Sequence, residues 1–439
     1  MTDHPSGSDG SAPHADALLS GRKGYVLVIL FLVYTFNYVD RQILVILAQP
    51  IKTEFGLKDW QLGFLTGTAF ALFYATLGMP IARLADRWHR VNIIAISLTL
   101  WSAMTSLCAA TTSFVQLALA RVGVGVGEAG GSPPALSLIS SYFDRGHRAT
   151  AMGVYSLGPT VGILLGFVVG GWVNEQYGWR AAMLVAGFPG LALAVLVKLT
   201  IAEPRTVAGA AEQFSDALPP FWATVRTLFR IPAFTLLNVA TVAAGISLYG
   251  FMVWVPVYLI REFALSTREV GTVVGLCAGF AGSFGVFCGG WLTDRLSRRD
   301  HRWQLRVPGL TTLVFCPLVL LVINAGSAHA AFLLMVPTYM CALAYTGPSW
   351  AVLQSIVPPN MRATAAAILL FLVNLIGLAL GPQLVGLLSD VLQGHAPGVG
   401  GLRLAITIVA TGSLIATLFF FIASNALKAE PAEQPAATP

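Results

Sequence analysis

Charged residues are scarce in this chain: Asp, Glu, Lys and Arg make up 10% of its 439 residues, whereas soluble domains carry about 25%. Windows without any charge are long enough to cross a lipid bilayer, as at 91–120, 149–174 and 404–427. A soluble core does not explain such windows. The sequence therefore predicts an all-α polytopic membrane protein.

Other signatures are missing as well. The five cysteines lie within apolar runs without a CxxC or Cys/His cluster, so neither a disulfide framework nor a metal site is indicated, and we expect no cofactor. The net charge of +6 comes from basic residues scattered between apolar runs, which gives no reason to expect nucleic acid. There is no HExxH motif, no Ser/His/Asp arrangement, and no filter loop or ring of like charge, which disfavours an enzyme and a channel.

The apolar segments predict twelve transmembrane helices. Most Lys and Arg residues fall on the side that holds both termini, which predicts cytoplasmic N- and C-termini. The predicted helices lie near residues 24–48, 61–85, 91–110, 114–141, 149–172, 181–201, 233–260, 270–292, 307–326, 330–357, 363–388 and 402–427.

The longest polar interruption divides these helices six and six. We expect disordered cytoplasmic tails at 1–21 and 428–439, and six-helix bundles at 22–202 and 231–427. The linker at 203–230 would be cytoplasmic. Its end, 221–230, places apolar side chains on one face and could form a helix at the membrane interface, or an ordinary amphipathic linker.

An internal repeat supports two related halves. The residues DRWHR at 86–90 follow the second predicted span, and DRLSR at 294–298 follows the eighth. The residues RATA at 148–151 recur at 362–365, at a nearly equal offset. Two six-helix pseudo-symmetric bundles are the plan of a secondary transporter, with the substrate site between the halves.

Four charges stand within the first-half spans: Asp40 and Arg41 in the first, Arg121 and Glu128 in the fourth. A charge near the bilayer centre costs about 2.5–3.5 kcal/mol, so these residues should face a polar interior. Arg121 and Glu128 share a helical face, about 10 Å apart along the axis. By counting residues from the membrane surface, we expect Asp40, Arg41 and Arg121 at similar depth and Glu128 deeper.

Several motifs resemble those of the major facilitator superfamily. The loop at 86–90 resembles the superfamily's cytoplasmic motif between helices two and three, with Ala82 and His89 where that motif has glycines. RVGVGVGE at 121–128 is similar to its Arg-containing motif in helix four, and GPTVG at 158–162 resembles part of a glycine-proline motif associated with antiporters. The resemblance covers about 24–427 and implies the major facilitator fold.

Within that superfamily, NYVDR at 37–41 combined with GEA at 127–129 resembles the Spinster group. The resemblance implies a proton-coupled transporter working by alternating access, with an amphiphilic lysolipid- or sphingoid-type substrate. The alternative is a proton-coupled transporter of a small organic anion or drug. The resemblance to bacterial members also implies an integral protein of the bacterial inner membrane. We expect a monomer whose partners are substrate, protons and membrane lipids.

We assign roles to the charged residues. Asp40 and Glu128 would carry the coupling proton, while Arg41 and Arg121, which stay charged, would pair with them or bind a substrate headgroup. A static charge cluster is the alternative. A cytoplasmic gate would be formed by Asp86, Arg87, Arg90, Asp294, Arg295, Arg148 and Arg362, although these loops could instead serve only as topology signals. Candidate cavity residues, each of which could instead be packing, are Asn37, Tyr74, Asn238, Tyr249, Trp254, Tyr339, Tyr345 and Asn374.

Overall fold

The computed structural model describes residues 22–144, 146–204, 221–394 and 399–427, and within these ranges the chain is helical without strands. The predicted tails at 1–21 and 428–439 and most of the linker lie outside the described residues. The chain divides into two compact units, Met1–Leu47 with Phe73–Asp216, and Ala48–Leu72 with Ala217–Pro439.

The helices of the first unit are α2 (Lys23–Phe55), which continues into the second unit, α4 (Ala69–Arg87), α5 (Arg90–Cys108), α6 (Phe114–Glu128), α7 (Ser132–Tyr142), α8 (Arg148–Ser156) and α9 (Gly158–Thr200). Those of the second unit are α3 (Asp59–Gly63), η1 (Phe64–Thr68), α11 (Phe221–Phe229), α12 (Pro232–Phe263), α13 (Thr267–Leu276), η2 (Cys277–Ala281), α14 (Gly282–Ser297), α15 (Trp303–Ile323), α16 (Ala328–Ala344), α17 (Thr346–Ile356), η3 (Pro359–Met361), α18 (Arg362–Leu372), η4 (Val373–Leu378), α19 (Ala379–Leu392) and α20 (Gly400–Ala426).

Ten helices of the described chain are long and apolar enough to span a membrane. One of them, 148–200, contains two of the predicted spans, because the chain turns at Gly178 within α9. The φ of 82° at Gly178 lies in the region that glycine adopts without a Cβ clash. The predicted fourth span is present as α6 and α7, interrupted after Glu128. The arrangement is consistent with twelve spans.

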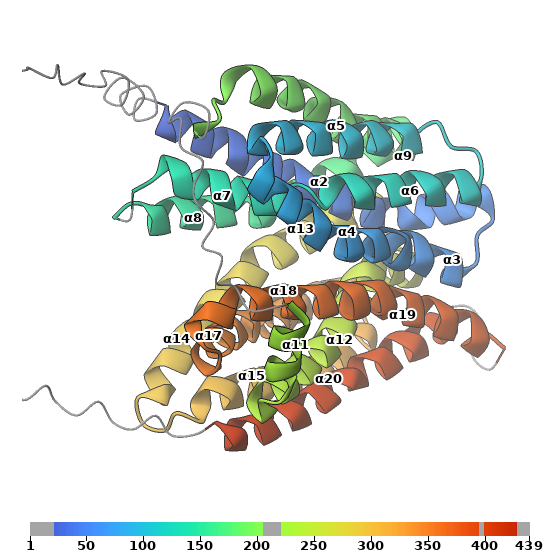
Figure 1. Cartoon of the computed structure of the whole chain (residues 1–439). Coiled ribbons are helices and arrows are strands. Elements are labelled where there is room, and N and C mark those ends of the chain that lie inside the picture. Colours follow the sequence, from blue (N-terminus) through green and yellow to red (C-terminus); the bar gives the residue numbers. More distant parts are fainter. Residues whose placement is uncertain (1–21, 145, 205–220, 395–398, 428–439) are drawn as a thin grey trace, which may run out of the picture. The chain divides into compact units, whose positions relative to one another are not determined.

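In the first unit, α5 packs against both α6 and α9, as Figure 1 shows. The packing is close because small residues stand at the crossings: a Cβ atom at Gly127 of α6 would lie 2.6 Å from the backbone nitrogen of Trp101. Small residues commonly allow such approach between membrane helices. This packing fixes α6, which carries two of the four predicted charges.

A buried ion pair between Arg90 and Glu203 links helix ends of the first unit. Arg90, the first residue of α5, donates from Nε to Glu203 Oε1 at 2.9 Å, and its backbone N–H donates to Glu203 Oε2 at 2.7 Å. Its Nη1 donates to the hydroxyl oxygens of Ser137 and Ser141 in α7. The arginine therefore joins the start of α5, the end of α7 and the residues that follow α9.

In the second unit, α20 packs against α12, α15 and α19 (Figure 1). Hydroxyl groups link these helices: Ser247 Oγ donates to the carbonyl oxygen of Val409 at 2.8 Å, and the Thr312 and Thr417 hydroxyls lie 3.0 Å apart. Such bonds satisfy polar groups that lipid cannot. The short helix α11 contacts α12 and α18 and leaves Trp222 78% exposed.

The division of the chain differs from the predicted bundles at one segment. Residues 48–72, the end of α2 through the beginning of α4, belong to the second unit, although the sequence repeat assigns them to the first half. The cause is a set of ion pairs and close backbone contacts to α12 and α19.

Candidate functional site

The four charges predicted within the spans are all in the first unit. Asp40, Arg121 and Glu128 are 1%, 2% and 1% exposed, and the Arg41 side chain is 14% exposed. Asp40 and Arg41 lie midway along α2, whereas α6 holds Arg121 and ends at Glu128. Two acids and two bases are thus buried together with no formal net charge.

Arg41 and Glu128 form an ion pair. Arg41 Nε donates to Glu128 Oε2 at 2.7 Å, and the Glu128 side chain is fully buried. Residue counting predicts Glu128 at a greater depth than Arg41, yet the two side chains are in direct contact. Such a charge-assisted bond is stronger than one between neutral groups, and breaking it leaves a buried charge.

Asp40 stands in a different environment from Glu128. Both of its carboxylate oxygens are buried, and within the described part of the chain no donor lies in hydrogen-bonding geometry to either. Arg121 is close enough to interact electrostatically with both carboxylates. The site therefore holds one carboxylate in a direct ion pair and another without a hydrogen bond.

Tyrosine rings surround the Arg41 guanidinium. Its Cζ lies 4.5 Å from the ring centroid of Tyr74 and 5.0 Å from that of Tyr38. Tyr34 meets the ring of Tyr38 edge-on at 5.5 Å and stacks on Tyr155 at 4.5 Å. Cations bind to such ring faces. The sequence interpretation included Tyr74 only, although Tyr34 and Tyr38 are four residues apart on one helical face, a signal that could have identified them.

The other predicted cavity residues fall in both units. Asn37 is buried in α2, one turn before Arg41. In the second unit, Trp254 donates from Nε1 to the carbonyl oxygen of Pro382 at 2.8 Å. Asn238 donates to the carbonyl oxygen of Phe234 in α12, and Asn374 in η4 donates to that of Leu370 in α18, each at 2.8 Å. The assignment of these residues to a cavity stays a prediction.

The three predicted tyrosines of the second unit differ in their surroundings. Tyr339 is fully buried and its hydroxyl has no hydrogen-bond partner among the described residues. Tyr345 is buried beside the ring of Phe420, at a centroid distance of 6.1 Å. Tyr249 is half-buried in α12.

The predicted gate residues also divide between the units. In the first unit, Arg90 takes part in the buried pair with Glu203, and Arg148 Nη2 donates to the carbonyl oxygen of Ser140 at 2.8 Å, near the end of α7. The side chains of Asp86 and Arg87 lie outside the described part of the chain.

In the second unit, Asp294, Arg295 and Arg362 are all exposed. Arg295 lies 5.5 Å from the ring centroid of Trp291, and Arg362 is the first residue of α18. The pairing of these loops with the opposite half stays a prediction.

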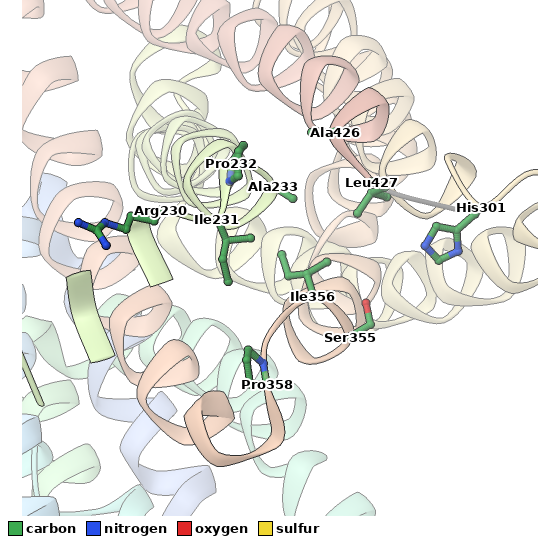
Figure 2. A pocket seen from close by; sticks show the side chains of 10 residues that line it. All are labelled: Arg230, Ile231, Pro232, Ala233, His301, Ser355, Ile356, Pro358, Ala426 and Leu427. Carbon is green, nitrogen blue, oxygen red and sulfur yellow. The ribbon is translucent and has the colours of Figure 1, made fainter. Parts of the chain in front are cut away.

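A half-open cavity of about 490 Å³ lies at the helix ends of the second unit (Figure 2). It contains none of the predicted site residues. Figure 2 shows His301 and Arg230 on opposite sides of mostly apolar walls. No group of three or more His, Cys, Asp or Glu side chains within the described ranges could hold a metal ion. The lining residues are Arg230, Ile231, Pro232, Ala233, His301, Ser355, Ile356, Pro358, Ala426 and Leu427.

Comparison with known proteins agrees with this architecture. Residues 30–382 match the family model described as the Major Facilitator Superfamily. An MFS-type efflux pump of Mycolicibacterium smegmatis is 33% identical over 94% of this chain and 95% of its own length. Human protein spinster homolog 1 is 28% identical over 87% of this chain and 75% of its own length.

A solved structure is similar over nearly the whole chain. It is a bacterial homolog to the human lysosomal transporter Spinster, in an inward-facing and unoccupied conformation, with 31% sequence identity and a TM-score of 0.82. The similarity covers 92% of this chain and 97% of that one. The resemblance identified from the motifs is thus confirmed. This polytopic helical chain, with its buried charges on α2 and α6, belongs to the major facilitator superfamily, whose members are transporters and not enzymes.

Proposed function

We propose that this transporter is driven by protons and works by alternating access, with Glu128 and Asp40 as the proton carriers. The observation that carries the proposal is the buried Arg41–Glu128 ion pair beside an Asp40 carboxylate without a hydrogen bond. A carboxylate that alternates between an ion pair and a protonated form needs a permanently charged partner, and arginine supplies one.

The contacts of Glu128 and Arg41 suggest an order of events during transport. Protonation of Glu128 would cancel its charge and release Arg41, whose guanidinium also contacts the rings of Tyr38 and Tyr74. A freed guanidinium then attracts another anion, either a substrate headgroup or the carboxylate that Asp40 becomes once it has lost a proton. Because an ionised carboxylate that is buried without a donor is costly, we propose that Asp40 carries a proton in the state described by this structure.

We propose an amphiphilic substrate of lysolipid or sphingoid type, in keeping with the spinster relatives. Its polar head would meet the charges of the first unit. A small organic anion is the second candidate, and a relative favours it: a hexuronate transporter of Bacillus subtilis is 26% identical over 83% of this chain. The phosphate of a lysophospholipid or the carboxylate of a small organic anion could take the place of Glu128 at Arg41.

A binding screen separates the two substrate classes. Purified protein would be tested for thermal stabilisation by lysophospholipids, sphingoid bases and sugar acids, with Arg41→Gln as the matched variant. The proposal predicts stabilisation by an amphiphile. Stabilisation by sugar acids alone, lost in Arg41→Gln, would favour the second candidate.

Tyr74→Leu should slow transport at a given pH by about 2- to 30-fold, because it removes a cation–π contact of roughly 0.5–2 kcal/mol that holds Arg41. Tyr74→Phe retains the ring face and should keep most of the rate. The measurement is the initial uptake rate in proteoliposomes at several pH values. If both variants behave alike, the ring does not position Arg41.

Asp86→Asn or Asp294→Asn should shift the protein partly toward inward-open states. Each removes a carboxylate that we expect at a helix N-terminus of the other half, an interaction of roughly 0.3–1 kcal/mol at exposed positions. Distances between spin labels on the cytoplasmic face would report the shift. Unchanged populations in both variants would leave these loops as topology signals only.

We propose that the protein acts as a monomer in the bacterial inner membrane with both termini in the cytoplasm. The distribution of Lys and Arg supports this orientation. Cysteine labelling from either side tests it, since the variants Glu212→Cys and His329→Cys should react with a membrane-impermeant thiol reagent added on opposite sides.

A further inference from the structure

The segment 48–72 connects to the first unit at both ends but packs within the second. It begins inside α2 and ends inside α4, so two continuous helices lead from it into the first unit. A segment in this position must either stay with the second unit permanently or exchange its contacts whenever the two halves of the repeat move.

Asp59, at the start of α3, is the centre of the contacts that hold the segment. Its side chain is fully buried, and it receives Arg261 Nη2 on Oδ1 at 2.7 Å and Arg261 Nη1 on Oδ2 at 2.9 Å. Lys52 also donates to Oδ1, and the Ser389 hydroxyl donates to Oδ2 at 2.6 Å. Arg261 Nε in turn donates to Gln49 Oε1 at 2.7 Å. The carboxylate thus joins its own segment to both α12 and α19.

Asp390 of α19 accepts hydrogen bonds from the backbone of segment 48–72. Its Oδ1 accepts from the backbone N–H of Asp59 at 3.0 Å, and its Oδ2 accepts from that of Trp60 at 2.8 Å. The packing alongside is tight, since a Cβ atom at Gly63 would lie 2.6 Å from the carbonyl oxygen of Pro382. A Cβ atom at Gly386 would lie 2.4 Å from the carbonyl oxygen of Asp59.

The formal charges at this contact allow segment 48–72 to separate from α12 and α19. The four charged residues of the segment, Lys52, Glu54, Lys58 and Asp59, sum to no formal charge, and Lys52 and Asp59 already bond to each other. Opposite the segment stand one cation and one anion, Arg261 and Asp390. Separation would therefore leave each side with balanced formal charge. Without Lys52 in its own segment, the Asp59 carboxylate would have no cation beside it once Arg261 moved away, and a buried unpaired charge is costly.

We infer that Lys52, Asp59 and Arg261 form a latch that binds segment 48–72 to the second unit in one state of the transport cycle and opens in another. Within the latch, Asp59 is the positioning residue, because it alone accepts from both cations and from Ser389. The inference rests on alternating access but not on proton coupling or on the nature of the substrate.

The chain offers a matched control. Arg403 of α20 forms an ion pair with Glu262 at the end of α12. Both residues belong to the second half of the repeat, and Glu262 directly follows Arg261. Loss of this pair should lower stability without releasing segment 48–72.

The test places spin labels at Lys58 and Arg268, which are both exposed, one on the segment and one in the second half. Distances would be measured in the full chain in lipid nanodiscs, with the native cysteines replaced. Asp59→Asn should raise the ratio of long to short distances by about tenfold or more, and Ser389→Ala, which removes one bond only, should raise it less. Arg403→Gln should leave the ratio unchanged.

The latch is refuted if Ser389→Ala and Asp59→Asn leave the distances unchanged, or if Arg403→Gln changes them as much. Should Asp59→Asn not fold, Ser389→Ala and the double variant Lys52→Gln/Asp59→Asn test the same joint. Since the distances need neither substrate nor a proton gradient, failure of the latch is distinguishable from failure of proton coupling.

Discussion

Replacing Glu128 with glutamine should abolish pH-driven uptake and leave the protein folded. The amide keeps the size of the side chain, and its oxygen can still accept from Arg41 Nε, but it cannot take up or release a proton. Uptake of a fluorescent lysophospholipid into proteoliposomes under a pH gradient should fall to the level of protein-free vesicles. Exchange of the same lipid at equal pH should continue.

Glu262→Gln is the matched control for this result. Glu262 also pairs with an arginine, but it lies at the end of α12 and is 25% exposed. We expect this variant to keep pH-driven uptake. Accumulation at the wild-type level in Glu128→Gln would mean that the buried pair serves packing and that coupling resides elsewhere.

Replacing Arg90 with methionine should destabilise the protein by about 3–5 kcal/mol, since it removes the guanidinium that pairs with the buried carboxylate of Glu203. Both side chains are nearly inaccessible, at 2% and 3% exposure. Thermal unfolding of the purified variant, and the concentration of denaturant at its midpoint, measure the loss.

The surface pair Arg306–Asp300 is the comparison for Arg90. Its two side chains are 27% and 41% exposed, and its shortest N–O distance is 3.2 Å. Arg306→Met should cost about 0–1 kcal/mol, because solvent screens such a pair. If Arg90→Met and Arg306→Met lower the free energy of unfolding equally, burial does not decide how much Arg90 contributes to stability.

Much of the fold can be predicted from the sequence because lipid imposes simple rules. A spanning segment must be apolar and helical, so the charge-free windows locate α5, α12, α15 and α20 within a few residues. Segment 48–72 could not be assigned in this way. Its place in the second unit depends on Asp59 meeting Arg261, about 200 residues later in the chain, and nothing in the local pattern encodes that contact.

The four buried charges of the first unit could be identified from the sequence, but which of them pair could not. Asp40, Arg41, Arg121 and Glu128 are visible because charge is expensive in lipid. Glu128 pairs with Arg41. That pairing depends on the length and direction of the two side chains, and counting residues along straight helices takes neither into account. Aromatic residues that contact Arg41 look like ordinary core residues in an apolar sequence, so of these only Tyr74 was identified.

The most direct test of the central claim is simultaneous recording of proton and substrate movement in proteoliposomes. Wild-type protein, Asp40→Asn and Glu128→Gln would be compared with a fluorescent lysophospholipid and an internal pH dye. We predict that wild-type protein moves protons and substrate at a constant ratio. In each variant, we expect substrate movement that is no longer accompanied by proton movement at that ratio. If both variants keep the wild-type ratio of protons to substrate, Asp40 and Glu128 are structural and the claim is wrong.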